Sequence, residues 1–218
     1  MKAVFFDLDN TLYVTRNYYL GSFNEISSYL SSKYSVDKNQ VYQFLANLWQ
    51  EKSSMYSHLF DDLIKEQNLD TEIISELLKI FNNYEIKKED LYDDVIPTLT
   101  KLKDDYNIGL ITDGTVLRQR RKIKTLDIEK FFDVIVFTKN FEPKPSSKAY
   151  LEALNKIKIK SNFTTYVGDN PILDFKGAKE VGMKTIRIKR GEFRDIKNND
   201  DVDYTIKNLL ELEKILQK

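Results

Sequence analysis

The sequence predicts an α/β fold, in which a parallel sheet is covered by helices and an all-helical segment is inserted after the first strand. Short apolar runs alternate with segments long enough for a helix, which is the pattern of a parallel sheet with helices on both faces. Residues 16–91 break this alternation and show helical periodicity instead. Hydrophobic residues make up 41% of the chain and charged residues 31%, which are the proportions of a globular protein with a sizeable core.

The predicted strands are short runs rich in β-branched or aromatic residues, as expected for strands buried on both faces. They span residues 3–6, 108–111, 134–137, 163–167 and 185–188. Helices are expected between the last four of these runs, at residues 115–126, 146–157 and 173–181. A short edge segment at 204–206 and a helix at 209–216 would complete the sheet domain.

The insertion carries apolar residues spaced three or four positions apart, as in Phe23, Ile26 and Leu30. Asp37 is the expected N-cap of its second helix, and Asp70 or Thr71 that of its fourth. We therefore predict a core domain of residues 1–15 and 92–218 and a helical domain of residues 16–91.

Charge and cysteine content exclude several classes of protein. The 34 basic and 34 acidic residues give no net charge, which argues against a nucleic-acid binder. The absence of cysteine excludes disulfides, a thiolate zinc site and a catalytic cysteine. No apolar run approaches the roughly 20 residues of a membrane helix, and Asp7 interrupts the apolar start too early for a signal peptide. We expect a cytoplasmic protein without a membrane partner.

Two carboxylates follow the first predicted strand, in the sequence Asp7-Leu8-Asp9-Asn10-Thr11. If the chain stays extended, Asp7 and Asp9 point the same way. Ligands of parallel α/β sheets bind beyond the carboxyl ends of the strands, where two carboxylates repel each other unless a cation or a proton intervenes. Mg²⁺, which prefers oxygen ligands, is the natural partner. A loop with aspartate caps is the alternative interpretation.

Three further segments follow later strands. Thr112-Asp113-Gly114 offers a hydroxyl and turn amides before a helix, and Lys144 stands between two prolines that stiffen its backbone. Gly168-Asp169-Asn170-Pro171-Ile172-Leu173-Asp174 ends the fourth strand and starts a helix. Taken alone, the Thr112 segment also fits ordinary turn chemistry, and Lys144 also fits an exposed loop lysine. A helix N-cap would explain Asp174 but not Asp169.

All four segments lie at the carboxyl ends of predicted strands, so they would converge on one edge of the sheet. That edge would gather four carboxylates, one hydroxyl and one lysine. Because a carboxylate cluster requires compensation, Mg²⁺ and Lys144 would both be needed there. A dianion held between metal, lysine and backbone amides describes a phosphate group.

The four motifs DLDNTL, LITDG, EPKP and VGDNPILDFKGAKEVGM closely resemble, in this order, those of the haloacid dehalogenase-like (HAD) hydrolase superfamily. The resemblance covers residues 1–12 and 94–189. It implies a Rossmann-like three-layer core with strand order 5-4-1-2-3. The helical insertion is similar to the C1 cap of one subfamily, which would close over the site as a lid.

The resemblance also implies roles for the matching residues. Asp7 would be the nucleophile that forms an aspartyl-phosphate, and Asp9 the general acid and then the general base. Thr112 and Lys144 would act in catalysis and bind phosphate. The metal ligands would be Asp7, Asp169 and the backbone carbonyl of Asp9, with Asp174 binding directly or through water.

One position departs from the family pattern. Relatives often have asparagine after the motif-two threonine, where this chain has Asp113. Asp113 and Gly114 are assigned to the phosphate-binding turn, but the Asp113 carboxylate is expected to point away from phosphate or to cap the next turn. The basic stretch Arg118, Arg120, Arg121, Lys122 and Lys124 that follows is interpreted as a solvated helix face.

The expected function is therefore a Mg²⁺-dependent phosphatase acting on a small phosphorylated metabolite. A phosphosugar, a triose phosphate, an acylneuraminate 9-phosphate or a nucleoside monophosphate would suit it. A phosphomutase and a non-catalytic binding protein with the same fold are the alternatives, whereas Asp9 argues against a dehalogenase. The sequence does not distinguish a monomer from a homodimer.

Overall fold

The computed structural model describes residues 2–217 and divides into two compact units. One unit holds the chain up to Thr15 and from Ile86 onward, and the other is Arg16–Glu85. The helical unit ends at Glu85, whereas its predicted end is residue 91. Residues 86–91 belong with the sheet because the Val14 amide donates to the Asp90 carbonyl (2.8 Å) and Tyr13 bridges to Leu91.

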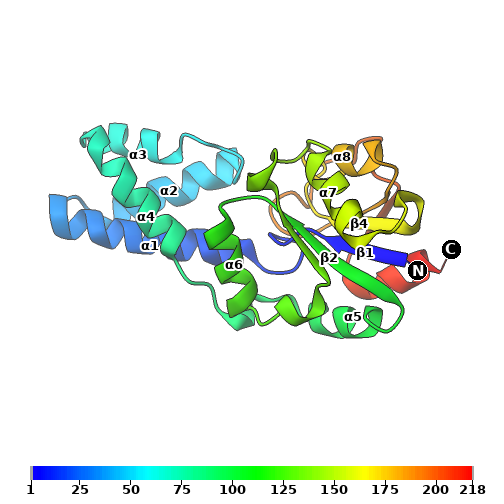
Figure 1. Cartoon of the computed structure of the whole chain (residues 1–218). Coiled ribbons are helices and arrows are strands. Elements are labelled where there is room, and N and C mark those ends of the chain that lie inside the picture. The colour runs from blue at the N-terminus through cyan, green and yellow to red at the C-terminus, as the bar shows by residue number, and fades with distance from the viewer. Residues whose placement is uncertain (1, 218) are drawn as a thin grey trace. The chain divides into compact units, whose positions relative to one another are not determined.

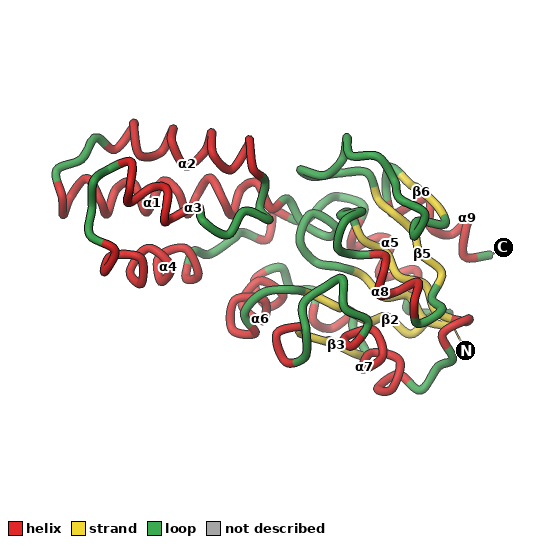
Figure 2. Tube along the Cα trace, turned by 90° about the horizontal axis from the view of Figure 1, so that it is seen from above, coloured by secondary structure: helices red, strands yellow, loops and turns green. Residues whose placement is uncertain are grey.

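The first unit contains a parallel sheet of six strands in the order β3-β2-β1-β4-β5-β6 (Figures 1 and 2). The strands are β1 (Lys2–Phe6), β2 (Tyr106–Thr112), β3 (Val134–Phe137), β4 (Thr164–Gly168), β5 (Lys184–Ile188) and β6 (Tyr204–Ile206). The α/β class and the predicted order of the first five strands are confirmed. β6 extends the sheet beyond β5 at the short segment predicted for an edge.

Helices cover both faces of this sheet. Helices α7 (Lys148–Ile157) and α8 (Phe175–Glu180) pack on one face, and α5 (Val95–Leu102) and α9 (Leu212–Leu216) lie on the other (Figures 1 and 2). Helix α6 (Val116–Thr125) follows β2. The first unit also has short 3₁₀ turns at Lys88–Asp90, Glu129–Phe131, Thr138–Asn140, Ser161–Phe163 and Leu209–Glu211.

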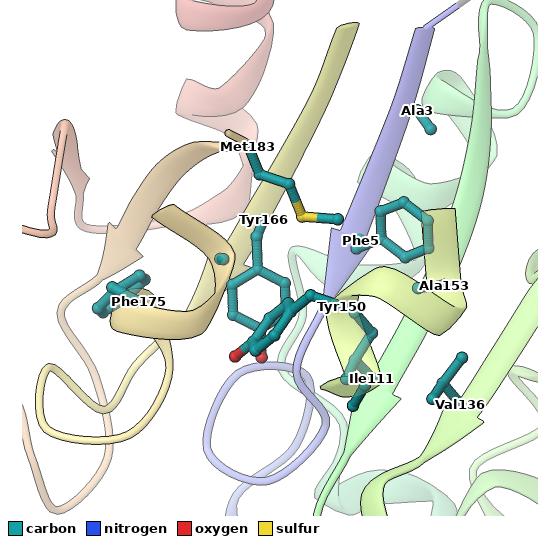
Figure 3. Packing of buried hydrophobic residues seen from close by; sticks show 11 residues of the cluster. Ala3, Phe5, Ile111, Val136, Tyr150, Ala153, Tyr166, Phe175 and Met183 are labelled. Carbon is teal, nitrogen blue, oxygen red and sulfur yellow. The ribbon is translucent and has the colours of Figure 1, made fainter. Parts of the chain in front are cut away.

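A buried cluster between the sheet and helices α7 and α8 fixes the strands that lead to the candidate site. Phe5 on β1 is fully buried beside Ile111 and Tyr166 (Figure 3). The rings of Tyr150 and Tyr166 meet edge to face, with centroids 5.0 Å apart. Such aromatic contacts stabilise a core beyond simple area burial. The hydroxyl of Tyr150 donates to the backbone carbonyl of Asp174 (2.6 Å), so the core extends directly to a candidate site residue.

The second unit consists of four helices, α1 (Thr15–Tyr34), α2 (Lys38–Lys52), α3 (Leu59–Glu66) and α4 (Ile74–Asn83), with a 3₁₀ turn at Thr71–Ile73. Their apolar stripes are buried, as at Leu30, Leu45 and Leu63. Asp37 caps α2 by accepting a hydrogen bond from the Gln40 amide (2.8 Å), as predicted. Asp70 caps the 3₁₀ turn that leads into α4.

Among residues 2–217, no helix combines the length and the apolar character needed to cross a membrane.

The buried cluster generates a stability prediction. We expect Phe5→Ala to lower the free energy of unfolding of the sheet unit by about 3–5 kcal/mol, because it removes a fully buried ring and leaves a cavity. Phe163→Ala is the matched control, since Phe163 is 51% exposed and its loss should cost about 1 kcal/mol or less. Urea unfolding curves of both variants measure the difference, and equal losses would contradict this description of the core.

Candidate active site

The residues singled out in the sequence lie at the carboxyl-terminal edge of the sheet. Asp7 follows β1, Thr112 ends β2, and Asp169 follows β4. Asp7, Asp169 and Asp174 each offer a carboxylate oxygen within 4.8 Å of the others, and all three side chains are buried. The loop after β3 brings Lys144 to the same place. The structure therefore brings three of the four predicted carboxylates together with the predicted lysine.

Lys144 is the centre of this cluster. Its ammonium lies 2.5 Å from Asp7 Oδ1, 2.7 Å from Asp174 Oδ1 and 3.1 Å from the Tyr166 hydroxyl. The residue is only 6% exposed. Burial alone would lower the pKa of Lys144, but the charges of Asp174 and Asp7 outweigh it and hold the pKa well above the usual value. The ammonium is thus a permanent positive charge at a fixed point beside Asp7.

The turn after β4 places Asp174 against the strand. A Cβ at Gly168 would lie 2.5 Å from Asp174 Oδ2, so only glycine allows this approach. Asp174 Oδ2 accepts a hydrogen bond from the Asn170 amide (2.9 Å), and Asp174 Oδ1 accepts one from the Tyr166 hydroxyl (3.1 Å). Both carboxylate oxygens of Asp174 are therefore held by named donors.

The Asp113 carboxylate is engaged with the loop that carries Lys144. Asp113 Oδ1 accepts hydrogen bonds from the Thr138 hydroxyl and from the Lys144 amide (3.3 Å for the latter). Gly114 follows with a φ of +107°, a conformation that L-residues rarely adopt, and this turn leads into α6. Asp113 thus positions the lysine loop through its side chain, while its backbone amide and that of Gly114 lie in the predicted phosphate-binding turn.

The acidic cluster is short of positive charge. Burial raises the pKa of Asp7 to about 8, because the nearby Lys144 offsets only part of the effect and Asp174 and Asp9 add to it. Burial and the charge of Asp174 also raise the pKa of Asp169 well above its usual value. Asp169 Oδ2 is buried without a hydrogen-bond partner in the described chain. Three converging carboxylates with an orphaned oxygen match the oxygen ligands that Mg²⁺ prefers.

The Asp9 carboxylate contacts side chains of α6 and Tyr13. It accepts hydrogen bonds from Lys122 Nζ (2.5 Å, at Oδ1), from Gln119 Nε2 (2.7 Å, at Oδ2) and from the Tyr13 hydroxyl. Burial raises the pKa of Asp9, but the charge and hydrogen bond of Lys122 more than offset it and bring it to about 2. Asp7 and Asp9 thus have different partners, since Asp7 contacts Lys144 and Asp9 contacts residues of α6.

Sequence reasoning missed Gln119 and Lys122. The interpretation of the basic stretch as a solvated face holds for the exposed Arg120 and Lys124 but is wrong for Lys122, which is 5% exposed. The missed signal is spacing: Gln119, Lys122 and Ile123 recur at helical intervals on the buried face of α6. Two polar residues on a buried helix face indicate polar partners in the interior.

The chain is similar to several known proteins. The family model "Haloacid dehalogenase-like hydrolase" matches residues 4–188. A glyceraldehyde 3-phosphate phosphatase of Methanocaldococcus jannaschii is 32% identical, covering 100% of this chain and 97% of the relative. The N-acylneuraminate-9-phosphatase of Homo sapiens is 27% identical, covering 100% of this chain and 94% of the relative. The crystal structure of a HAD phosphatase from Thermococcus onnurineus superposes with a TM-score of 0.72 at 30% identity, covering 99% and 98% of the two chains.

The raised pKa of Asp7 generates a prediction about metal binding. Below about pH 8 a proton on Asp7 competes with a cation, so Mg²⁺ affinity should rise up to about tenfold per pH unit between about pH 6 and pH 8. The metal-free protein should lose stability over the same range, because its folded state holds a proton that the unfolded state has released. Calorimetry in two buffers of different ionisation enthalpy measures the affinity and the released proton.

Two variants give that experiment its controls. Asp169→Asn should weaken Mg²⁺ binding on the order of 100-fold, since it removes a carboxylate of the cluster. Asp200→Asn changes an exposed aspartate outside the cluster and should leave the affinity unchanged. A Mg²⁺ affinity that does not vary with pH would contradict the assignment.

Proposed function

The chain belongs to the haloacid dehalogenase-like hydrolase family and is a phosphoric monoester hydrolase. We propose that it hydrolyses a small phosphosugar or triose phosphate. The proposed reaction depends on Mg²⁺ and proceeds through a phosphorylated Asp7. The observation that carries this proposal is the contact between the buried Lys144 ammonium and Asp7 Oδ1 (2.5 Å), at the edge where Thr112 ends β2. A carboxylate held beside a fixed positive charge is suited to attack a phosphoryl group that the same charge attracts.

The proposed reaction has two steps. In the first, an Asp7 oxygen attacks phosphorus, the bond from phosphorus to the ester oxygen breaks, and that oxygen takes a proton from Asp9. Asp9 takes up this proton when the phosphate dianion binds beside it, since a nearby negative charge favours the neutral acid. In the second step, water loses a proton to Asp9 and attacks phosphorus, and the bond between phosphorus and Asp7 breaks.

Charge stabilisation in both steps would come from groups already in place. Lys144 would neutralise negative charge on the phosphoryl oxygens, and the Thr112 hydroxyl with the amides of Asp113 and Gly114 would bind them. Asp7, Asp169, Asp174 and the backbone carbonyl of Asp9 are the proposed holders of Mg²⁺. When bound there, Mg²⁺ would offset the carboxylate charge and polarise a phosphoryl oxygen.

Glyceraldehyde 3-phosphate is the substrate we propose first. The support is the set of relatives named as glyceraldehyde 3-phosphate phosphatases, which are 32% identical in Methanocaldococcus jannaschii and 30% in Pyrococcus furiosus, each covering 100% of this chain. An N-acylneuraminate 9-phosphate ranks second, because the relatives with that name are less similar, at 27% identity for the Homo sapiens protein.

The mechanism predicts the effect of removing the nucleophile. Asp7→Asn should lower Mg²⁺-dependent phosphate release by at least about 10³-fold, because the amide does not form the aspartyl-phosphate, which is an acyl phosphate. Asp104→Asn, at an exposed aspartate of the same unit, should retain wild-type activity. Both variants are compared by phosphate release from an aryl phosphate, and robust activity of Asp7→Asn would refute the mechanism.

The substrate proposal predicts an order of preference. In a panel of phosphorylated metabolites, we expect kcat/KM for glyceraldehyde 3-phosphate to exceed that for N-acylneuraminate 9-phosphate and for nucleoside monophosphates by about tenfold or more, a difference of about 1.4 kcal/mol in transition-state binding. Phosphate release measured for each compound tests the order. An isomerised sugar phosphate formed without phosphate release would instead support a phosphomutase.

A further inference from the structure

We propose that Gln119 and Lys122 of α6 are positioning residues, which hold the Asp9 carboxylate and the Thr112 hydroxyl in the arrangement that leaving-group protonation and phosphate binding require. The inference rests on the proposed function and deepens it. It assigns a role to two buried polar side chains that the mechanism above does not use directly.

Gln119 connects the Asp9 carboxylate and the Thr112 hydroxyl through one nitrogen atom. Its Nε2 lies 2.7 Å from Asp9 Oδ2 and 2.6 Å from Thr112 Oγ1. An amide nitrogen carries two hydrogens, so each partner receives one and the donor is fully used. Because the side chain is completely buried, water does not compete for these hydrogen bonds. Gln119 therefore fixes the distance between the end of β2 and the loop after β1.

This arrangement also orients the Thr112 hydroxyl. The hydroxyl accepts from Gln119, so its own hydrogen must point elsewhere. Among the described residues 2–217, that hydrogen has only a long contact, 3.5 Å to the Asp113 carbonyl. A phosphoryl oxygen is a stronger acceptor and would replace this contact. Gln119 thus makes Thr112 a donor toward the substrate.

Lys122 fixes the other oxygen of Asp9. Its ammonium lies 2.5 Å from Asp9 Oδ1 and 5.2 Å from the centre of the Tyr13 ring. Because Lys122 is three residues after Gln119 on α6, both side chains project from the same helix face. The side chain of Asp9 nevertheless remains 31% exposed, whereas that of Asp7 is 7% exposed. Asp9 is held in place yet stays accessible.

Packing alone does not account for the polar side chains of Gln119 and Lys122 at these buried positions. The nearby Ile123 on α6 and Leu126, which directly follows α6, are apolar and fully or nearly fully buried. Apolar replacement of buried ion pairs is often neutral or stabilising, so a buried lysine here is weak evidence for a stability role. Gln119 Oε1 is buried without a hydrogen-bond partner among residues 2–217, a cost that an apolar residue would avoid.

The test compares two substrates that differ in their need for an acid. The phenolate of an aryl phosphate is a stable anion and departs without taking up a proton. The alkoxide of the alkyl ester glycerol 3-phosphate must be protonated as it departs. We expect Lys122→Met to lower kcat/KM for the alkyl ester by about 100-fold, within the usual contribution of general acid catalysis, and for the aryl ester by less than about tenfold. The quantity kcat/KM is chosen because it reports the step in which the leaving group departs.

Three further variants sharpen the comparison. Gln119→Leu should lower kcat/KM for both esters and weaken inhibition by inorganic phosphate by about tenfold, because Thr112 loses its orientation. Lys122→Arg keeps the charge and should keep the ratio between the two substrates within about threefold of wild type. Lys124→Met, at an exposed lysine of the same helix, should change neither rate. Thermal unfolding of every variant confirms that it is folded.

Equal losses for the two esters in Lys122→Met, or no loss, would overturn the inference while leaving the proposed function intact. A wild-type protein that releases no phosphate, or an Asp7→Asn variant that remains active, would overturn the proposed function and this inference with it. The two failures are therefore distinguishable.

Discussion

The buried ammonium of Lys144 is the interaction on which the rest of the candidate site depends. It joins Asp7 after β1, Tyr166 on β4 and Asp174 after β4 through contacts of 2.5–3.1 Å. Removing one partner of such a buried ion pair leaves an uncompensated charge, which is far costlier than never burying the pair. The glycine at position 168 and the carboxylate of Asp113 serve this same arrangement, one by admitting Asp174 and the other by holding the lysine loop.

Two aspartates only two positions apart acquire opposite properties from their surroundings. Burial raises the pKa of Asp7 to about 8, whereas Lys122 overcomes burial at Asp9 and brings its pKa to about 2. In the metal-free protein the proton therefore resides on Asp7, from which a bound cation would displace it. At Asp7 the effect of burial exceeds that of Lys144, which also contacts Asp174, whereas at Asp9 the charge and hydrogen bond of Lys122 exceed the effect of burial.

The sequence was sufficient to predict the sheet and its reactive edge, since buried strands and the turns that end them leave strong local signals. Asp7, Asp169 and Lys144 could be placed together because parallel strands end at one edge. The partners of the Asp9 side chain were not predictable, because two of them come from α6, which lies more than one hundred residues later in the sequence. The burial of Lys122 was hidden by its charged neighbours, and only its spacing from Gln119 and Ile123 distinguishes it from a solvated residue.

The position of β1 within the sheet has a consequence for how the chain acquires its structure. β1 pairs with β2, about one hundred residues later, and with β4, which ends at Gly168. The unit Arg16–Glu85 lies between β1 and β2 in the sequence and is built of α-helices, whose hydrogen bonds are local and form quickly. During synthesis the helices of Arg16–Glu85 can therefore fold while β1 still lacks both neighbours. The strand that leads to Asp7 therefore gains its second neighbour only once β4 has been made.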